Sequence, residues 1–337
     1  MFRIQLEGAA GGFACHAGDT VLRAGLRAGL ALPYECNVGA CGTCKFELLQ
    51  GEVLNLRENA PGLSARDRAK GRLLGCQARP LGDCTIKLRL DEACRPAVPP
   101  AMRLAELTGT QDLTHDIREF HFRAQGRAQF LPGQYALLHL PDVNAPRAYS
   151  MSNIANADGH WHFQIRRTPA GAATGVLFDQ MRIGDRIEID GPYGIAYLRT
   201  DIARDVVCIA GGSGLAPMLS VARGLADSQA MHARRLHFFY GARTPRDICG
   251  ADLLRQLPGF GERMAYYATV SAPAAGNPPW HGHTGFVHEL VRDTLAPALA
   301  DHEFYLAGPP PMIEAVEHLL LVEHGVPPGQ IHFDRYF

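Results

Sequence analysis

The sequence predicts a chain of several domains that combines α+β and α/β architecture. Three observations support this fold class. Four regularly spaced cysteines lie in an α+β pattern over residues 1–92, short strands with turn residues between them dominate residues 102–200, and strands alternate with helices from residue 201 onward. We therefore expect a small first domain at 1–92, a proline-rich linker at 93–101, an antiparallel β-barrel at 102–200 and a Rossmann-like parallel-sheet domain at 201–337.

The bulk composition is that of a globular protein. A length of 337 residues is enough for two or three domains. Hydrophobic residues make up 47% and charged residues 20%, which excludes a disordered chain, and a net charge of −1 gives no general attraction for nucleic acid or membrane. No apolar run reaches the roughly 18 residues of a spanning helix, and the N-terminus lacks a signal-peptide pattern. We expect a cytoplasmic protein that binds neither nucleic acid nor membrane.

The first domain shows strand and helix patterns around its cysteines. Alternating apolar residues predict strands at Phe2–Leu6 and Thr85–Leu90, with a hairpin partner near Phe13–His16. Asp19 and Thr20 supply N-cap candidates for a helix over Val21–Ala28.

The strongest chemical signal is a set of four cysteines: Cys36, Cys41, Cys44 and Cys76. A C-x4-C-x2-C run followed by a distant cysteine is the spacing with which plant-type ferredoxins hold a [2Fe–2S] cluster. Gly39 and Gly42 fit a tight loop that turns backbone N–H groups toward the sulfurs. The alternatives are a zinc site or buried structural thiols, although zinc sites usually pair their cysteines in two compact units.

The other five cysteines are scattered along the chain, so we expect free thiols in a reducing compartment: Cys15, Cys84, Cys94, Cys208 and Cys249. The linker at 93–101 carries three prolines and favours a semi-rigid extended segment, although a long surface loop has the same composition.

The two remaining domains differ in their strand patterns. Short strands in the second predict a barrel or sandwich: Met102–Thr108, Ile117–Arg123, Tyr135–Leu140, Trp161–Arg166 and Arg186–Asp190. In the third, the continuously apolar Val206–Ala210 predicts a strand that is buried on both faces. Further strands alternate with helices there: strands Leu236–Tyr240, Met264–Val270 and Glu303–Ala307, and helices Leu219–Leu225, Phe286–Leu295 and Pro311–His324.

Three polar or glycine-rich segments are candidate binding sites. Arg147 to Asn153 places an arginine, an aromatic ring and hydroxyls along one extended segment, which suits a phosphate and a flat ring but is also ordinary for an exposed strand. Gly171–Thr174 opens a helix and offers N–H groups to a phosphate, or Thr174 is a plain N-cap. Gly211–Gly214 and Gly308-Pro309 each follow a strand, where open α/β sheets bind nucleotides, although a lone glycine turn is weak evidence.

These motifs in this order resemble the ferredoxin–NADP reductase superfamily: Arg147-x-Tyr149-Ser150, Gly171…Thr174, Gly211–Pro217, Tyr240–Arg243 and Gly308–Met312. With a plant-type ferredoxin pattern in front, the chain resembles the reductase components of bacterial aromatic-ring oxygenases. The segments Leu32–Cys36 and Ile331–Phe337 look closest to toluene monooxygenase reductases. The resemblance implies a β-grasp first domain, and electron transfer from NADH through FAD and a [2Fe–2S] cluster to a Rieske ferredoxin or the oxygenase (hydroxylase) component.

The resemblance also implies roles for individual residues. Tyr149 and Ser150 would lie against the isoalloxazine as the catalytic residues, Arg147 would meet an FAD phosphate, and the aromatic rings of Phe333 and Phe337 would cover the flavin. The remaining cofactor-binding residues are Met151, Ser152, Gly171 and Thr174 for FAD, and Gly211, Gly212, Ser213, Gly214, Gly308 and Pro309 for the nicotinamide nucleotide. One departure is Ala307, because the family commonly has a cysteine there that is associated with hydride-transfer geometry.

Several choices stay open at this level. NADH is preferred to NADPH by resemblance only, because Arg243 and Arg246 follow a strand where a 2′-phosphate could bind. The partner could be a Rieske-type dioxygenase system instead of a monooxygenase, and a non-catalytic iron–sulfur redox sensor is an alternative of another class. We expect a monomer that meets its partner transiently. We interpret three groups as solvated surface residues: His281 and His283, the pair Arg234–Arg235 and the segment Arg66–Arg72. The last of these lies in the cluster domain and could instead face a partner.

Overall fold

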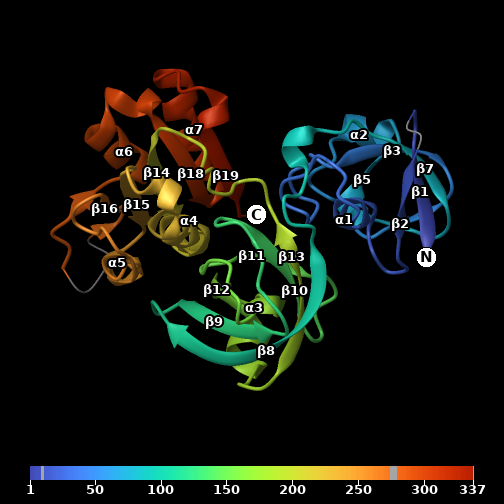
Figure 1. Ribbon diagram of the computed structural model, residues 1–337, viewed down its shortest axis with the longest axis horizontal. Coiled ribbons are helices and arrows are strands. Elements are labelled where there is room, and N and C mark those ends of the chain that lie inside the picture. Colours follow the sequence, from blue (N-terminus) through green and yellow to red (C-terminus); the bar gives the residue numbers. More distant parts are fainter. Residues whose placement is uncertain (9–10, 274–278, 337) are drawn as a thin grey trace. The chain divides into compact units, whose positions relative to one another are not determined.

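The structure is a computed structural model that describes residues 1–8, 11–273 and 279–336, and the chain divides into two compact units (Figure 1). Unit 1 comprises Met1–Met102 with Asp190–Ile195, and unit 2 comprises Arg103–Ile189 with Ala196–Phe337. Phe337 itself, which we expect to cover a flavin, lies outside the described residues.

Unit 1 is built on a five-stranded mixed sheet in the order β2-β1-β7-β3-β5. Strands β1 and β7 are parallel, and the other pairs are antiparallel. Helix α1 packs on this sheet through Val21 and Ala24, which join a core that includes Ile4, Phe46 and Ile86. One helix packed across a mixed sheet is the predicted β-grasp fold. The elements are β1 (Phe2–Leu6), β2 (Gly12–Cys15), α1 (Val21–Arg27), β3 (Lys45–Gln50), β4 (Val53–Asn55), α2 (Ala65–Ala69), β5 (Arg72–Leu74), β6 (Ala78–Pro80) and β7 (Cys84–Lys87).

The first sheet of unit 2 has six strands in the order β11-β10-β13-β8-β9-β12. An isolated antiparallel bridge between Met151 and Phe163 joins its two ends, so the sheet closes into the predicted barrel. Fully buried Phe120, Phe122 and Trp161 fill the interior. The elements are β8 (Ala101–Asp112), β9 (Ile117–Ala124), β10 (Tyr135–His139), β11 (Arg147–Ser150), β12 (His160–Arg166), α3 (Ala172–Gly175) and β13 (Arg186–Tyr193), and a π-helical turn (Val176–Gln180) continues α3.

The second sheet of unit 2 is parallel, in the order β17-β16-β15-β14-β18-β19. Helices α4 and α5 cover one face and α6 and α7 cover the other, and β14 is almost entirely buried between them. This is the predicted doubly wound α/β fold. The elements are β14 (Asp205–Gly211), α4 (Leu215–Asp227), β15 (Leu236–Ala242), α5 (Ala251–Arg255), β16 (Met264–Val270), β17 (His283–Thr284), α6 (Val287–Leu295), β18 (His302–Gly308), α7 (Pro310–Glu317) and β19 (Ile331–Arg335).

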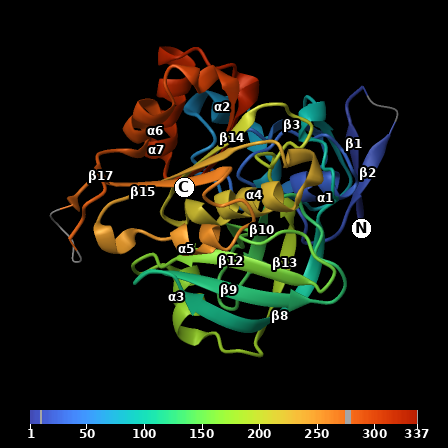
Figure 2. The same ribbon diagram turned by 60° about the vertical axis from the view of Figure 1, so that its left-hand side comes forward.

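Helix α4 connects the barrel and the parallel sheet within unit 2 (Figures 1 and 2). Ser220 on α4 accepts a hydrogen bond from the backbone N–H of Gly133 at 3.3 Å and donates one to the carbonyl of Asn153 at 2.7 Å. Arg223, nearly one turn later, donates to the carbonyl of Ser152 at 2.7 Å. These contacts hold two loops of the barrel against α4, which packs on the parallel sheet.

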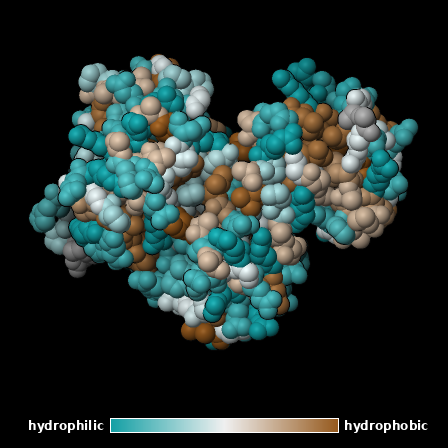
Figure 3. All heavy atoms as spheres, viewed as in Figure 1, coloured by the Kyte–Doolittle hydropathy of each residue, from teal (hydrophilic) through white to brown (hydrophobic). Residues whose placement is uncertain are grey.

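On the face in Figure 3, hydrophobic residues are scattered among hydrophilic ones, which is ordinary for a folded protein. Across the residues that the structure describes, no helix has both the length and the apolar character needed to cross a membrane.

Candidate functional site

The four cysteines of the predicted cluster motif come together in unit 1. Cys36, Cys41 and Cys44 lie in the loop before β3, and Cys76 lies in a short 3-10 turn, Gly75–Gln77. The thiols form two hydrogen-bonded pairs: Cys36 with Cys41, and Cys44 with Cys76. Within each pair the shared hydrogen bond raises the pKa of one thiol and lowers that of the other, so that the pKa of Cys41 falls to about 5 and that of Cys76 is lowered.

The loop wraps around these thiols as its glycines predict. The backbone N–H groups of Ala40 and Cys41 both donate to the sulfur of Cys36 at 3.3 Å, and Gln77 Nε2 donates to the sulfur of Cys76 at 3.5 Å. Gly42 has a φ of 78°, and a Cβ there would lie 2.2 Å from the carbonyl oxygen of Gly62. Only glycine therefore fits where the loop meets its neighbouring segment.

The spacing of the sulfurs separates the two metal interpretations. Among the residues described, no three of the four sulfurs all lie within 4.8 Å of one another. A tetrahedral zinc ion with Zn–S bonds of about 2.3 Å would hold all four sulfurs at about 3.8 Å from each other. Two separated pairs of thiols suit a cluster of two irons, each of which takes two cysteines. All nine cysteines are free thiols, so no disulfide competes for them.

A second set of residues surrounds Ser150 on strand β11 of the barrel. The Ser150 hydroxyl donates to Asp334 Oδ2 at 3.1 Å and accepts a hydrogen bond from the Tyr336 hydroxyl at 3.2 Å. Burial raises the pKa of Asp334 to about 6, and the hydrogen bond from Ser150 opposes this shift. Asp334 and Tyr336 lie in the segment Ile331–Phe337 that carries the family resemblance, but no role was assigned to them, because they meet the barrel only in the folded protein.

The predicted flavin residues on β11 differ in exposure. Arg147 is exposed, and its guanidinium donates to the carbonyl of Ala145 at 2.8 Å. Tyr149 packs against the barrel core, and burial raises the pKa of its hydroxyl to about 12. Met151 is fully buried in that core, and the Ser152 hydroxyl donates to Glu119 at 2.7 Å, so both side chains hold the barrel together.

Two other predicted flavin residues have structural partners in the fold. Thr174 lies in the first turn of α3 after the N-cap Gly171, and its hydroxyl is 3.2 Å from the carbonyls of Thr168 and Gly171. Phe333 packs against the hydrophobic core beside α6 and α7, where the Arg335 guanidinium covers its ring at 4.3 Å. Asp334 and Tyr336 therefore lie on the opposite side of β19 from Phe333, because successive side chains alternate.

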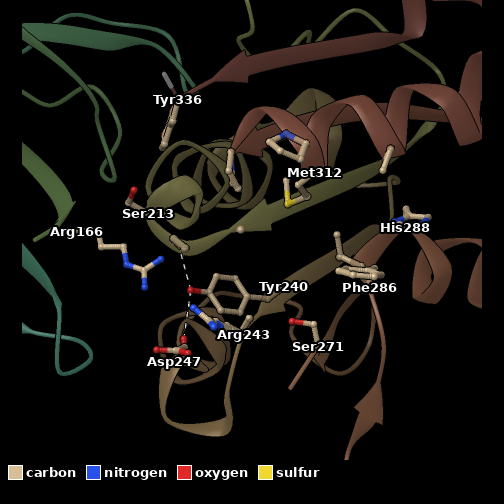
Figure 4. Close-up of a pocket in the computed structure, with 18 of the residues that line it drawn as sticks. Arg166, Ser213, Tyr240, Arg243, Asp247, Ser271, Phe286, His288, Met312 and Tyr336 are labelled. Atoms are coloured by element: carbon tan, nitrogen blue, oxygen red, sulfur yellow. Dashed lines mark hydrogen bonds between the residues drawn. The ribbon is translucent and has the colours of Figure 1, made fainter. Parts of the chain in front are cut away.

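The third site is a cavity of about 720 Å³ at the carboxyl ends of β14, β15 and β18 (Figure 4). Tyr336 and Ser213 lie on one side, and Phe286 and His288 lie on the other. Its wall includes four predicted nucleotide-binding residues, Gly211, Gly212, Ser213 and Pro309. Gly214 and Gly308 are not among the lining residues. A Cβ on Gly214 would lie 2.0 Å from the carbonyl oxygen of Ala307, so this glycine lets α4 begin close to β18.

Two arginines and two aspartates line one end of the cavity: Arg166, Arg243, Asp116 and Asp247. Arg243 is exposed there, while Arg166 pairs with Asp116 at 2.6 Å. The Tyr240 hydroxyl donates to the carbonyl of Gly212 at 3.2 Å and ties the glycine turn to β15. A cavity of this size, with N–H groups of a strand-to-helix turn on its wall, fits a dinucleotide.

His281 and His283 are exposed, and His283 belongs to the short strand β17. His283 contacts Thr269 Oγ1 at 3.2 Å, and neither it nor His281 belongs to a group of metal-ligating side chains among the described residues. Glu119, His121 and His162 do lie together on the barrel, but the Glu119 carboxylate is already bonded to His121, Ser152 and Gln164. The Glu119 carboxylate is therefore part of a hydrogen-bond network within the barrel.

Comparison with known proteins gives three family matches along the chain. Residues 4–81 match the 2Fe-2S iron-sulfur cluster binding domain, residues 104–197 the oxidoreductase FAD-binding domain, and residues 208–318 the oxidoreductase NAD-binding domain. These matches agree with the predicted order of cofactor domains.

Several characterised proteins are similar over nearly the whole chain. The ferredoxin–NAD(P)+ reductase CarAd of Metapseudomonas resinovorans is 39% identical and covers 100% of both chains. The xylene/toluene monooxygenase electron transfer component XylA of Pseudomonas putida is 34% identical over 99% of this chain and 93% of its own. A solved structure of the ferredoxin reductase in carbazole 1,9a-dioxygenase superposes with a TM-score of 0.91 at 36% identity, covering 100% of this chain and 98% of that one.

Proposed function

The chain belongs to the family of ferredoxin–NAD(P)+ reductases that serve as electron-transfer components of oxygenase systems, and from this premise we propose that it passes electrons from NADH through FAD and a [2Fe–2S] cluster to a separate acceptor protein. One observation carries the proposal. Tyr336 borders the nucleotide cavity and also donates a hydrogen bond to Ser150 of the barrel, so the proposed nicotinamide and flavin sites adjoin each other within unit 2.

The cofactors supply the redox chemistry when bound: FAD exchanges electrons singly or in pairs, and the cluster carries one at a time. The protein's own residues bind and orient them. Arg147 is exposed, and its guanidinium bonds to backbone carbonyls and to no carboxylate of the described residues, so it is available to a flavin phosphate. We propose Tyr149 and Ser150 as the residues against the reacting ring, and Tyr336 as the aromatic beside it in place of Phe333. The pairs Cys36/Cys41 and Cys44/Cys76 would each hold one iron.

Ser150 and Asp334 form a short hydrogen-bonded path that can hold a proton next to the proposed flavin site. The carboxyl of Asp334 has a pKa raised to about 6 by burial, so a proton resides on it more readily than on an exposed aspartate. The Ser150 hydroxyl lies 3.1 Å away and can relay that proton. Asp334 is therefore a positioning residue that acts through Ser150.

We propose NADH as the donor rather than NADPH. The relatives differ on this point, since one is described as a ferredoxin–NAD(+) reductase and another as a ferredoxin–NAD(P)(+) reductase. The preference for NADH rests on the family resemblance, because exposed Arg243 in the cavity is a side chain that could equally engage the 2′-phosphate of NADPH. Comparable kcat/KM values for the two nucleotides would contradict the proposal.

The acceptor is proposed to be a Rieske ferredoxin or the hydroxylase of a toluene or aromatic monooxygenase system. A dioxygenase system is the second candidate, favoured by the full-length similarity to the reductase in carbazole 1,9a-dioxygenase. Reduction of purified acceptors of both kinds distinguishes the two. We further propose that the protein works as a monomer in the cytoplasm, a reducing compartment that keeps its nine cysteines as free thiols.

The acceptor is expected to dock beside the cluster loop, on a basic surface. The backbone N–H of Gly62 donates to the carbonyl of Gly39, and Arg57 donates to the carbonyl of Val38, so residues 57–62 cover this loop. Helix α2 follows directly and adds exposed Arg66, Arg68 and Lys70. A surface of this charge favours an acceptor with an acidic docking face.

Anaerobic titration of the purified protein with NADH, followed by absorbance and EPR, tests the whole proposal. Bleaching of a flavin band followed by a rhombic signal of a reduced [2Fe–2S] cluster is the expected result. Bleaching without the signal would mean that electrons do not pass from flavin to cluster. No bleaching with NADH or NADPH would favour the redox-sensor alternative.

A further inference from the structure

Arg23 is a buried cation in an unfavourable position. It is only 8% exposed, although arginine is rarely buried without a partner. It is the third residue of α1, and its backbone N–H donates to the N-cap Thr20 Oγ1 at 3.4 Å. The first turn of a helix carries partial positive charge, so a cation there is repelled. The fold must therefore provide a compensating anion nearby.

No carboxylate of the described residues forms an ion pair with Arg23. Within that part of the chain, no acidic oxygen lies within 4.0 Å of the Arg23 guanidinium, and the side chain makes one hydrogen bond, from Nε to Asn37 Oδ1 at 3.3 Å. Arg27, one turn later on the same helix, takes the nearby acids: it pairs with Asp19 at 2.9 Å and with Asp190 at 2.6 Å. The two arginines of α1 thus differ in that only Arg27 has a carboxylate partner.

Arg23 contacts the loop that carries the predicted cluster cysteines, through Asn37. Asn37 follows Cys36 directly, is fully buried, and adopts a φ of 54° in the loop. Helix α1 packs on the turn that carries Cys76, where a Cβ on Gly75 would lie 3.4 Å from Leu22 Cβ. Arg23 is therefore hydrogen-bonded to the residue that follows Cys36, and its neighbour Leu22 packs on the turn that carries Cys76.

We propose that Arg23 is the buried counter-ion of the [2Fe–2S] cluster and raises its reduction potential. The inference rests on the proposed function, because it assumes that the cluster is bound. A cluster held by four thiolates is anionic and gains one further negative charge when it takes an electron, with no bond made or broken. A fixed cation in the same low-dielectric interior stabilises the reduced form more than the oxidised form. Arg23 thereby favours electron transfer onto the cluster.

The test measures the midpoint potential of the cluster by EPR-monitored anaerobic redox titration of the full-length protein, with iron and sulfide content determined for each variant. Arg23→Gln keeps a hydrogen-bond donor for Asn37 but removes the charge, and Arg23→Met removes both. Arg23→Lys keeps the charge. Arg3→Gln is the matched control, because Arg3 is an exposed arginine of the same unit whose charge is screened by solvent.

For both neutral variants we expect the one-electron equilibrium to shift about tenfold toward the oxidised cluster. This shift corresponds to a midpoint potential about 59 mV below that of the wild type. Arg23→Lys and Arg3→Gln should stay close to the wild type. Equal midpoint potentials for Arg23→Gln, Arg23→Met and the wild type would overturn the inference. A shift in Arg23→Lys as large as that of the neutral variants would also overturn it, because the cause would then be hydrogen-bond geometry and not charge.

Cluster assembly gives a second readout. If neither neutral variant takes up iron and sulfide but Arg23→Lys does, the charge is required to hold the anionic cluster, and the inference is supported. If all three variants fail to assemble it, Arg23 acts through packing and the inference is wrong. A wild-type protein without iron and sulfide would instead contradict the proposed function itself.

Discussion

Tyr336 donates a hydrogen bond to Ser150 across 186 residues of sequence, and its ring also borders the nucleotide cavity. The end of the parallel-sheet domain therefore closes the space between the two proposed cofactor sites of unit 2. A nicotinamide ring that reaches the flavin from this cavity has to displace the tyrosine.

Replacing Tyr336 with alanine should tighten the binding of the oxidised and reduced nicotinamide nucleotides. Displacement of the wild-type side chain costs one hydrogen bond of about 1 kcal/mol, so we expect the Kd to fall about fivefold. Titration of the oxidised protein with NAD+ measures this, and Tyr336→Phe, which keeps the ring, separates the hydrogen bond from the bulk of the ring. Unchanged or weaker binding in Tyr336→Ala would show that the ring does not occupy the nicotinamide path.

Asp334 makes the stability of the protein depend on pH. Its pKa is raised by burial from 3.8 to about 6, so the folded state binds more protons than the unfolded state between about pH 4 and pH 6. The stabilisation that the proton provides is complete below pH 4 and is lost as the pH rises through 6. Asp334→Asn keeps a neutral side chain beside Ser150, so it should be more stable than the wild type at pH 7 by about 3 kcal/mol and close to it at pH 4. Denaturation at both pH values checks the difference. A constant gap between the two proteins would show that Asp334 does not titrate in this range.

Cys76 should be required for the cluster but not for flavin reduction. Cys76→Ser removes a fully buried ligand, so we expect loss of the cluster EPR signal and of acceptor reduction by at least a hundredfold. Ferricyanide reduction, which draws electrons from the flavin, should stay within about twofold of the wild type. Cys84→Ser is the control, since Cys84 is also buried but bonds to the carbonyl of Glu52 away from the motif. Loss of ferricyanide reduction in Cys76→Ser alone would mean that the two units do not function independently.

Local patterns predicted those parts of the molecule that depend on neighbouring residues. The spacing grouped four cysteines that the fold brings together in unit 1, and strand β14 follows from a continuous apolar run that the fold buries on both faces. The cysteine loop and β14 owe their conformations mainly to residues that are close in the sequence, so local sequence patterns predict them.

Features that depend on distant contacts were not predicted. Strand β19 and the bonds of Asp334 and Tyr336 to Ser150 exist only because β19 pairs with β18 at the edge of the parallel sheet. The flavin-covering role that the family resemblance implies for Phe333 stays a prediction, and in the structure its ring packs against the hydrophobic core beside α6 and α7. A two-residue periodicity gives the two faces of a strand, but it does not say which face meets the barrel.

Gly214 should tolerate no side chain. Its Cβ would lie 2.0 Å from the backbone oxygen of Ala307, so Gly214→Ala must push α4 away from β18 and distort the wall of the cavity. We expect a loss of about 1–3 kcal/mol of stability and a rise in KM for NADH of at least tenfold. Gly175→Ala is the matched control, because its φ is −59° and nothing lies within 4 Å of the added Cβ. Thermal denaturation and steady-state kinetics give both quantities, and a normal KM in a folded Gly214→Ala protein would contradict the assigned role of this turn.

Charge on α2 should control the reaction with the protein acceptor. Arg66 and Lys70 are exposed beside the cluster loop, so a double change to glutamate reverses the field that an acidic acceptor meets. We expect the apparent second-order rate of acceptor reduction to fall at least tenfold at low salt, and the rate of the wild type to fall as salt is added. Ferricyanide reduction serves as the internal reference, and Arg3→Glu with Arg89→Glu supplies the same charge change elsewhere on unit 1. Equal losses in the two double variants would assign the effect to net charge, and a rate that is insensitive to salt would remove α2 from the docking surface.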